Sequence, residues 1–375
     1  MKIFVPKENV PGERRVAMIP SVVRKFTQAG FDVEVETGAG ASGFFSDPEY
    51  IEAGASIAAD FAGGCADAQV VASVRPLGLR AQGLPKECVA ISYISPVTDT
   101  ETISAVASAG ASLLSFDLVP RISRAQSMDA LTSQALVSGY RAALVAAEQL
   151  PSFFPLFMTA AGTIQPAKVL VLGAGVAGLQ AIATAKRLGA KVSAYDVRPA
   201  SADEVKSMGA TFVTLDLDAL EGQGGYAREM SEDRSTRQRE LLTPYIAASD
   251  AVITTAAVPG RAAPLLVTQE MVETMHPGSV VVDLASESGG NVEGSRPGET
   301  VEMGGVFVWG AQDVASSMPV HASQLYAMNV LALSTLLIHE ESISVDLEDE
   351  ILDGCAVVVN GEVRNQVARE ALGVN

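Results

Sequence analysis

Cysteine and histidine are scarce in this sequence of 375 residues, which contains three of each. Cys65, Cys88 and Cys355 are isolated and odd in number, which argues against a disulfide framework and is typical of a reducing compartment. None of the histidines lies in a recognisable catalytic motif, and neither a Ser/His/Asp nor a Cys/His arrangement is evident. Metal-ligand spacing is absent as well, so we predict no metal site.

Positive charge is also in short supply. Acidic residues outnumber basic ones by 44 to 26, which gives a formal net charge of −18. A nucleic-acid partner is therefore excluded, because binding it requires an excess of Lys and Arg to replace counterions. The same balance argues against direct adhesion to anionic lipid.

Long apolar runs that could cross a membrane are lacking too. The two longest uncharged runs cover residues 149–167, which contain three prolines, and residues 169–185, which contain three glycines in a turn pattern. A spanning helix needs about 20 mostly apolar residues without such interruptions. We interpret the first run as a Pro-broken approach to the second. The N-terminus has no apolar core of signal-peptide length, so we expect a soluble cytoplasmic chain.

What the sequence does contain is an alternation of short β-rich runs with helical stretches, which predicts parallel sheets with helices on both faces. The first series of predicted strands is Lys2–Pro6, Val33–Glu36, Gln69–Val74, Cys88–Tyr93 and Ser112–Leu118. The second series is Val169–Leu172, Lys191–Asp196, Thr211–Thr214, Ala251–Thr255, Ser279–Leu284 and Val306–Trp309. Two α/β domains follow, in agreement with about 100–200 residues per domain.

Two long helical stretches, residues 127–149 and 321–339, bracket the second series. They indicate that the chain passes between the domains twice. We therefore predict two Rossmann-like doubly wound domains joined by long helices, the first formed by residues 1–130 plus about 325–375 and the second by residues 140–320. The tail from residue 340 to 375 either packs on the first domain or mediates dimer contacts.

A glycine-rich turn between a predicted strand and a predicted helix is the best local motif. Gly173 permits a tight turn, Gly175 lets the backbone approach a pyrophosphate, and Gly178 allows close packing of helix on strand. Asp196 ends the next strand, 18 residues beyond the last glycine, where a carboxylate would bind the adenosine ribose and repel a 2′-phosphate. The motif predicts an NAD site, with Arg198 packed near the adenosine.

Two loops that follow strands of the second domain should flank the nicotinamide half of the cofactor. They are residues 254–264 and 283–290. Ligands of such sheets bind beyond the carboxyl ends of the strands, which is where both loops begin.

The sequence resembles a known family in several segments. PKENVPGERRVAMIP (residues 6–20) is similar to the opening shared by alanine dehydrogenases and the NAD(H)-binding component of proton-translocating transhydrogenase. PRISRAQSMDAL (residues 120–131) resembles the transhydrogenase and not alanine dehydrogenase. Further similar segments are residues 158–190, 224–230, 258–264 and 277–285.

The resemblance implies an oxidoreductase and translocase of the Re/Si-specific NAD(P)+ transhydrogenase type. In that family this component is a dimer of Rossmann-like chains that binds NAD(H) and docks on a membrane-spanning subunit and an NADP(H)-binding subunit. Hydride transfer between the two cofactors is coupled to proton translocation. The implied location is cytoplasmic and peripheral, on the inner face of the cytoplasmic membrane through these partner subunits.

The resemblance also implies roles for particular residues. Arg121, Gln126 and Asp129 would act as catalytic residues that orient the nicotinamide and its ribose, together with Thr132 where the family usually has serine. Tyr226 would lie at the tip of a mobile loop that closes over the nucleotide. Further cofactor contacts are expected at Val176, Ala177, Val197, Gly225, Gln238 and Ala257. Apart from Gln238, the charged run 228–239 is typical of a solvated helix face.

Two alternatives remain. An alanine dehydrogenase-like enzyme would need an Arg, a Lys, a His and an Asp. Arg15 is present, but Arg75 and Ser73 stand near the expected Lys, residues 92–95 offer no His, and Glu287 takes the carboxylate position. The other alternative is an NAD-binding regulatory module without a hydride acceptor, since only one glycine motif of this kind occurs in the chain.

Overall fold

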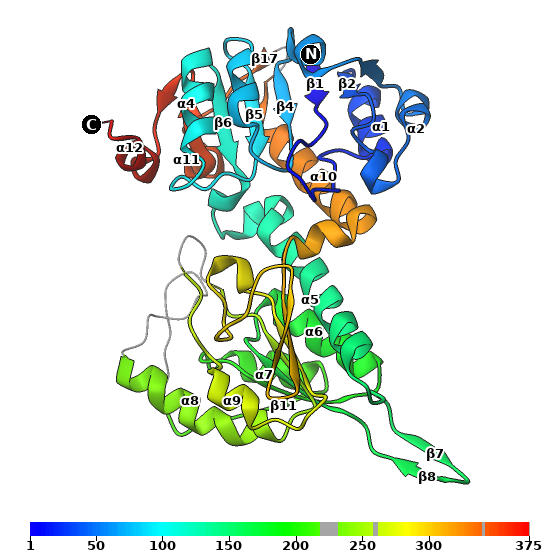
Figure 1. Cartoon of the computed structure of the whole chain (residues 1–375). Helices are drawn as coiled ribbons and strands as arrows, with labels where there is room; N and C mark the ends of the chain where they lie inside the picture. Colours follow the sequence, from blue (N-terminus) through cyan, green and yellow to red (C-terminus); the bar gives the residue numbers. More distant parts are fainter. Residues whose placement is uncertain (218–231, 258–261, 340–341, 375) are drawn as a thin grey trace. The chain divides into compact units, whose positions relative to one another are not determined.

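The computed structural model describes residues 1–217, 232–257, 262–339 and 342–374. The chain divides into two compact units (Figure 1). Unit 1 consists of Met1–Gln134 and Ala315–Asn375, and unit 2 of Ala135–Val314. Each unit is built on a predominantly parallel sheet, which confirms the predicted α/β class.

The sheet of unit 1 has the order β19-β18-β6-β5-β4-β1-β2-β3 among the described residues. Its strands are β1 (Lys2–Val5), β2 (Asp32–Glu36), β3 (Ser56–Ala58), β4 (Val70–Ala72), β5 (Val89–Ser92), β6 (Ser112–Ser115), β18 (Ala356–Val359) and β19 (Glu362–Val363). The pairs from β3 to β6 are parallel, and β18 joins β6 in antiparallel orientation. All five strands predicted for the first series are present.

Helices cover both faces of this sheet. One face packs against α1 (Pro20–Gln28), α10 (Pro319–Leu337) and α11 (Glu350–Cys355), whose apolar side chains share a core with Ile3 and Val5. The other face packs against α3 (Phe61–Cys65), α4 (Thr100–Ala109) and α12 (Gln366–Leu372) around Phe4. Successive residues of β1 thus point to opposite cores, as the period of two along a strand requires. The remaining helix is α2 (Asp47–Glu52).

The C-terminal tail belongs to unit 1. Its strand β18 pairs with β6 through Ala356 and Leu114, and α12 packs on α4. The two possibilities left open by the sequence were packing on the first domain and dimer contacts. The structure shows the first, because β18 extends the sheet of unit 1 beyond β6.

The sheet of unit 2 has the order β11-β10-β9-β12-β13-β15-β14 among the described residues. Its strands are β9 (Lys168–Leu172), β10 (Lys191–Tyr195), β11 (Thr211–Phe212), β12 (Ala251–Thr254), β13 (Val280–Asp283), β14 (Thr300–Met303) and β15 (Val306–Gly310). The order reverses beside β9, since β10 lies on one side of it and β12 on the other. The carboxyl end of this pair is the place where open α/β sheets bind ligands.

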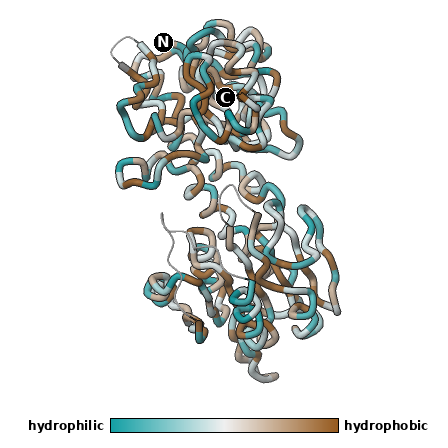
Figure 2. Tube along the Cα trace, turned by 90° about the vertical axis from the view of Figure 1, so that its left-hand side faces the viewer, coloured by the Kyte–Doolittle hydropathy of each residue, from teal (hydrophilic) through white to brown (hydrophobic). Residues whose placement is uncertain are grey.

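Both faces of the second sheet are also covered. α5 (Ala130–Gln149), α6 (Val176–Arg187) and α7 (Ser201–Ser207) pack on one face, and α8 (Glu232–Ala247) and α9 (Gln269–Glu273) on the other. Close packing of α5 on α6 depends on Gly139, where an added Cβ would lie 2.0 Å from the carbonyl oxygen of Ala177. The apolar residues of the strands stand out along the chain trace (Figure 2).

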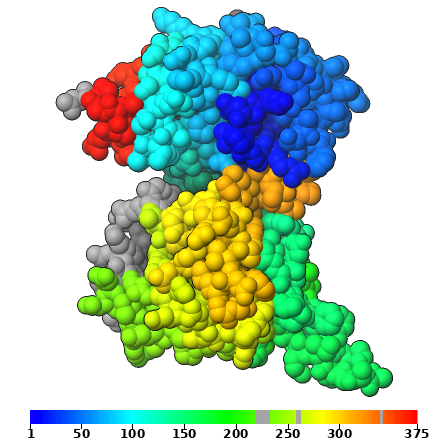
Figure 3. Space-filling view, viewed as in Figure 1, coloured from blue at the N-terminus to red at the C-terminus, as the bar shows by residue number. Residues whose placement is uncertain are grey.

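A β-hairpin occupies the segment that we interpreted as a Pro-broken approach, so that interpretation was incomplete. β7 (Phe157–Thr159) pairs with β8 (Gly162–Ile164) in antiparallel register, and the hairpin forms an arm projecting from unit 2 (Figures 1 and 3). Every residue of both strands is exposed.

No helix in the described part of the chain is long and apolar enough to cross a membrane.

Candidate functional site

The three glycines of the turn between β9 and α6 have different structural duties. Gly173 has φ +99°, a conformation that favours glycine. A Cβ added at Gly178 would lie 1.9 Å from the carbonyl oxygen of Gly173, so helix and turn can pack together only without a side chain there. A Cβ added at Gly175 would meet nothing within 4 Å. The fold therefore requires the first and third glycines, whereas the second leaves open space.

That open space lies at the amino terminus of α6. The helix begins after Gly175, and no side chain of the described residues caps it. The first N–H groups of a helix and its dipole favour an anion at this position. Val176 is exposed and Ala177 is half-buried in the first turn. The turn thus has the chemistry of a phosphate-binding site.

Asp196 follows β10 and fastens the turn from its other side. Its carboxylate accepts a hydrogen bond from the Ala174 backbone N–H at 2.7 Å. It also accepts from Arg198, through the backbone N–H at 2.8 Å and the side-chain Nε at 2.9 Å and Nη2 at 3.0 Å. This pairing raises the pKa of Arg198. Arg198 is thus held by Asp196, which leaves its charge compensated.

A buried amide without a partner is present on α8. Gln238 is 2% exposed, and neither its Nε2 nor its Oε1 has a hydrogen-bond partner in the described structure. Leaving such groups unsatisfied costs about 1–3 kcal/mol each, which a bound polar ligand would offset. The residue lies in the amino-terminal half of a helix that leads into β12, and helices of this kind begin at the carboxyl edge of the sheet. Gln238 therefore fits a nucleotide bound at that edge.

Arg234 lies one turn before Gln238 and was missed by the sequence reasoning. Burial raises the pKa of Tyr195, at the end of β10, to about 12, and the charge of Arg234 acts against this rise, which places Arg234 close to that strand end. Its Nε is buried and has no partner among the described residues. The prediction of a solvated face is correct for Arg237, which is exposed and pairs with Glu240 at 2.9 Å, but wrong for Arg234.

The loops after β12 and β13 are held together by two buried polar residues that the sequence did not single out. Asp283 is fully buried and accepts hydrogen bonds from the Thr254 hydroxyl and from the backbone N–H of Asn291. The Asn291 amide bonds to both backbone groups of Ala256 at 3.0 and 2.8 Å. Exposed Ala257 directly follows this anchor. The loop ends that we expected to flank the nicotinamide thus have a rigid base.

In unit 1, the predicted nicotinamide residues lie on the segment from β6 to α5. Arg121 and Gln126 are exposed. Asp129 and Thr132 bond to each other: the Thr132 backbone N–H donates at 2.8 Å and its hydroxyl at 2.6 Å to the Asp129 carboxylate. Asp129 therefore caps the first turn of α5, and its pairing fixes the hydroxyl of Thr132. Val197, near Arg198 in unit 2, is half-buried, and Tyr226 and Gly225 lie outside the described residues.

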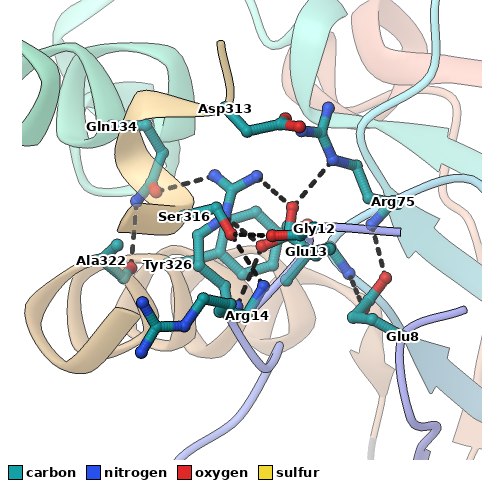
Figure 4. Close-up of polar contacts among 12 residues, drawn as sticks. Glu8, Gly12, Glu13, Arg14, Arg75, Gln134, Asp313, Ser316, Ala322 and Tyr326 are labelled. Carbon is teal, nitrogen blue, oxygen red and sulfur yellow. Dashed lines mark hydrogen bonds and ion pairs between the residues drawn. The ribbon is translucent and has the colours of Figure 1, made fainter. Parts of the chain in front are cut away.

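Arg15 in unit 1 is already bound to a carboxylate of its own chain. Its side chain is 5% exposed and donates to Glu13 through Nε at 2.8 Å and Nη2 at 2.6 Å, while Nη1 donates to Gln134 at 2.9 Å. Arg75 donates to the same Glu13 at 2.8 Å, and the backbone around it bonds to Glu8 (Figure 4). Although burial alone would raise it, Arg15 lowers the pKa of Glu13 to about 2.

This pairing bears on the alanine dehydrogenase alternative. A substrate carboxylate would need the guanidinium fork that Glu13 occupies. Near it, the Ser73 hydroxyl donates to the carbonyl oxygen of Arg75 at 2.8 Å, in place of the expected lysine. Glu287 lies in unit 2, where it accepts a hydrogen bond from the backbone of Asp313 at 3.0 Å. The residues present do not make an oxo-acid site around Arg15.

Comparisons with known proteins agree over the whole chain. Residues 4–138 match "Alanine dehydrogenase/PNT, N-terminal domain" and residues 142–366 match "Alanine dehydrogenase/PNT, C-terminal domain". The chain is 44% identical over 374 residues to an NAD(P) transhydrogenase subunit alpha chain of Rhodospirillum rubrum, with 97% of each chain covered.

Two solved structures are similar as well. One is a transhydrogenase from Sinorhizobium meliloti, with a TM-score of 0.88, 43% identity and coverage of 97% of this chain and 100% of that one. The other is an L-alanine dehydrogenase, with a TM-score of 0.82, 25% identity and coverage of 100% and 99%.

Proposed function

Because the chain belongs to the alanine dehydrogenase/PNT family, we propose that it is the NAD(H)-binding subunit of a proton-translocating NAD(P) transhydrogenase. The observation that carries the proposal is the 44% identity to a transhydrogenase alpha subunit along 97% of both chains. The occupied fork of Arg15 supports it against an amino-acid dehydrogenase. The reaction proposed is hydride transfer between NAD(H) held by this chain and NADP(H) held by a partner subunit.

In this proposal the chain contributes binding and orientation. NAD(H) supplies the hydride chemistry, and no side chain has to exchange a proton with it. The turn at Gly175 and the amino terminus of α6 receive the pyrophosphate, and Asp196 and Gln238 hold the adenosine side. Arg121, Gln126, Asp129, Thr132 and Tyr226 orient the nicotinamide. Proximity and orientation of the two reacting carbons, about 3–3.5 Å apart in a water-free site, then suffice for transfer.

The test is reconstitution with membrane-spanning and NADP(H)-binding transhydrogenase subunits. We expect NADH to reduce an NADP analogue, with proton movement across the vesicle membrane. If NADH binds but no reduction occurs in the complex, the chain is a regulatory module instead. If the isolated chain reduces NAD+ with alanine at an ordinary dehydrogenase rate, it is an alanine dehydrogenase. Partner subunits would hold it at the inner face of the cytoplasmic membrane.

Cofactor selectivity should depend on the Asp196–Arg198 pair. Replacing Asp196 with alanine removes the ribose acceptor and frees the Arg198 guanidinium, which is then able to pair with a 2′-phosphate. We expect NADH affinity to fall about tenfold and NADPH affinity to rise by a similar factor, measured by titration of cofactor fluorescence. Asp203→Ala, an exposed acid on α7, is the matched control and should change neither. Unchanged selectivity in the Asp196 variant would contradict this role.

The hairpin arm supports a homodimer within the same proposal. It exposes 75% of Met158, 43% of Phe157 and 46% of Ile164, an apolar surface that a second copy of the chain would bury. Phe157→Glu/Met158→Glu is expected to convert a particle of twice the chain mass into one of a single chain mass in sedimentation experiments. Leu79→Glu changes an equally exposed apolar residue of unit 1 and should leave the mass unchanged. A dimer that survives both hairpin charges would exclude the arm.

A further inference from the structure

The C-terminal tail supports the loop that carries the predicted nicotinamide residues. That loop, residues 119–129, leaves the sheet at the end of β6, and β18 of the tail pairs with β6 along its free edge. α11, which directly precedes β18, packs against the start of the loop: a Cβ added at Gly354 would lie 3.3 Å from Cδ of Pro120. Ile351 and Leu352 of this helix share the core with Ala125 and Met128 of the loop. The apolar side of the loop is thus built on the tail.

A bidentate ion pair joins the loop and the tail at the surface. Arg124 donates to Asp349 through Nη1 at 2.6 Å and Nη2 at 2.8 Å. Asp349 also accepts from the backbone N–H of Ile351 at 2.8 Å, which caps α11. The hydrogen bonds from Arg124 lower the pKa of Asp349 to about 2. Two parallel N–H···O bonds fix orientation as well as distance, so the pair sets the direction in which the loop leaves α11.

The opposite end of the loop is held by α10. Asn329 donates through Nδ2 to the backbone carbonyl of Ser127 at 2.8 Å, and its Oδ1 accepts from the Ser133 hydroxyl at 2.7 Å. Together with the Asp129 cap, these bonds fix the segment from Ser127 onward. Arg124 is therefore the polar anchor for the part of the loop between exposed Arg121 and exposed Gln126.

We propose that Asp349 is a positioning residue for hydride transfer, which acts through Arg124 to fix the loop that presents Arg121 and Gln126 to the nicotinamide. The inference rests on the proposed function. An exposed ion pair contributes little to global stability. Its loss should therefore disturb orientation at the reacting end of the cofactor more than folding. The adenosine end, bound at the glycine turn of unit 2, is anchored by other residues.

The test uses Asp349→Asn in the full chain, assembled with its membrane and NADP(H)-binding partners. Asparagine keeps the helix cap and removes the charge that binds Arg124. We expect kcat for hydride transfer to fall about five- to tenfold, with NADH affinity and thermal midpoint of the chain unchanged within about twofold and about 2 °C. Arg124→Met should reproduce the effect. The matched control is Asp353→Asn, an exposed acid of the same helix that pairs with Arg364 instead.

The outcomes separate this inference from the function on which it rests. If wild-type chain binds NADH but transfers no hydride, the proposed function fails before any variant is compared. If the wild type is active and Asp349→Asn transfers hydride at the same rate, the positioning role is wrong. Equal losses in the Asp349 and Asp353 variants, or a loss that follows the melting temperature, would also overturn it. The charge-reversed pair Arg124→Asp/Asp349→Arg should recover part of the rate lost in Arg124→Asp alone.

Discussion

Replacing Gly175 with alanine is expected to weaken NADH binding roughly tenfold or more and to leave the fold intact. The added Cβ meets nothing within 4 Å in the protein. The backbone there has φ −77° and ψ −169°, which any residue adopts, so we expect the free energy of unfolding to change by less than about 1 kcal/mol. The methyl group would instead enter the space into which the pyrophosphate must come.

Gly178→Ala provides the contrast, because its Cβ would lie 1.9 Å from the Gly173 carbonyl oxygen and must displace helix or turn. That variant should lose both stability and binding. The measurements are NADH titration by fluorescence and thermal unfolding of each variant. NADH affinity unchanged in Gly175→Ala would mean that the open space is not the pyrophosphate site.

The second large effect concerns the buried pair in unit 1. Arg15→Met should lower the free energy of unfolding by about 3–5 kcal/mol, because it leaves the Glu13 carboxylate buried without its main partner. The Glu13 side chain has no exposed surface and that of Arg15 is 5% exposed. Arg14→Met is the matched control, since Arg14 is exposed and lies over the Phe44 ring at 5.7 Å; it should cost about 1 kcal/mol or less. Urea unfolding of the three proteins measures both values.

The pH dependence of stability tests the same pair. A pKa lowered from 4.5 to about 2 corresponds to about 3 kcal/mol, present above pH 4.5 and lost as the pH falls from 4.5 towards 2. Glu13→Gln should remove this acid-side loss. Burial raises the pKa of Glu8 to about 7, so its contribution has the opposite sign and stability should decrease as the pH rises from 4.5 to 7. An Arg15→Met variant as stable as Arg14→Met would contradict the assignment.

The dinucleotide turn could be predicted from the sequence because its determinants are local. Gly173, Gly178 and Asp196 lie within one βαβ unit, and their spacing follows from the lengths of strand and helix. The family resemblance, which the domain matches confirm, likewise rests on continuous segments such as residues 120–131. The alternation of strands and helices was sufficient for the fold class, because each predicted strand carried its own apolar run.

Features that depend on distant partners could not be predicted. The antiparallel pairing of β18 with β6 joins residues that are far apart in the chain, such as Ala356 and Leu114, and the residues of β18 do not encode which strand they join. The hairpin arm was hidden among three prolines because its strands bury nothing in the chain itself. Asp283 and Asn291 look like ordinary loop residues until the sheet brings the ends of β12 and β13 together. Arg234 had the composition of a surface helix, and only the packing of α8 buries its Nε.

The position of β18 has a consequence for the order in which the protein folds as it is made. Unit 2 is an insertion within unit 1, so all of its strands leave the ribosome before the last strand of unit 1 has been translated. During that interval the edge of β6 is unpaired, and exposed edges promote association between nascent chains. Unit 2 should therefore acquire protease resistance first on stalled ribosomes, and unit 1 only after residue 363 has emerged.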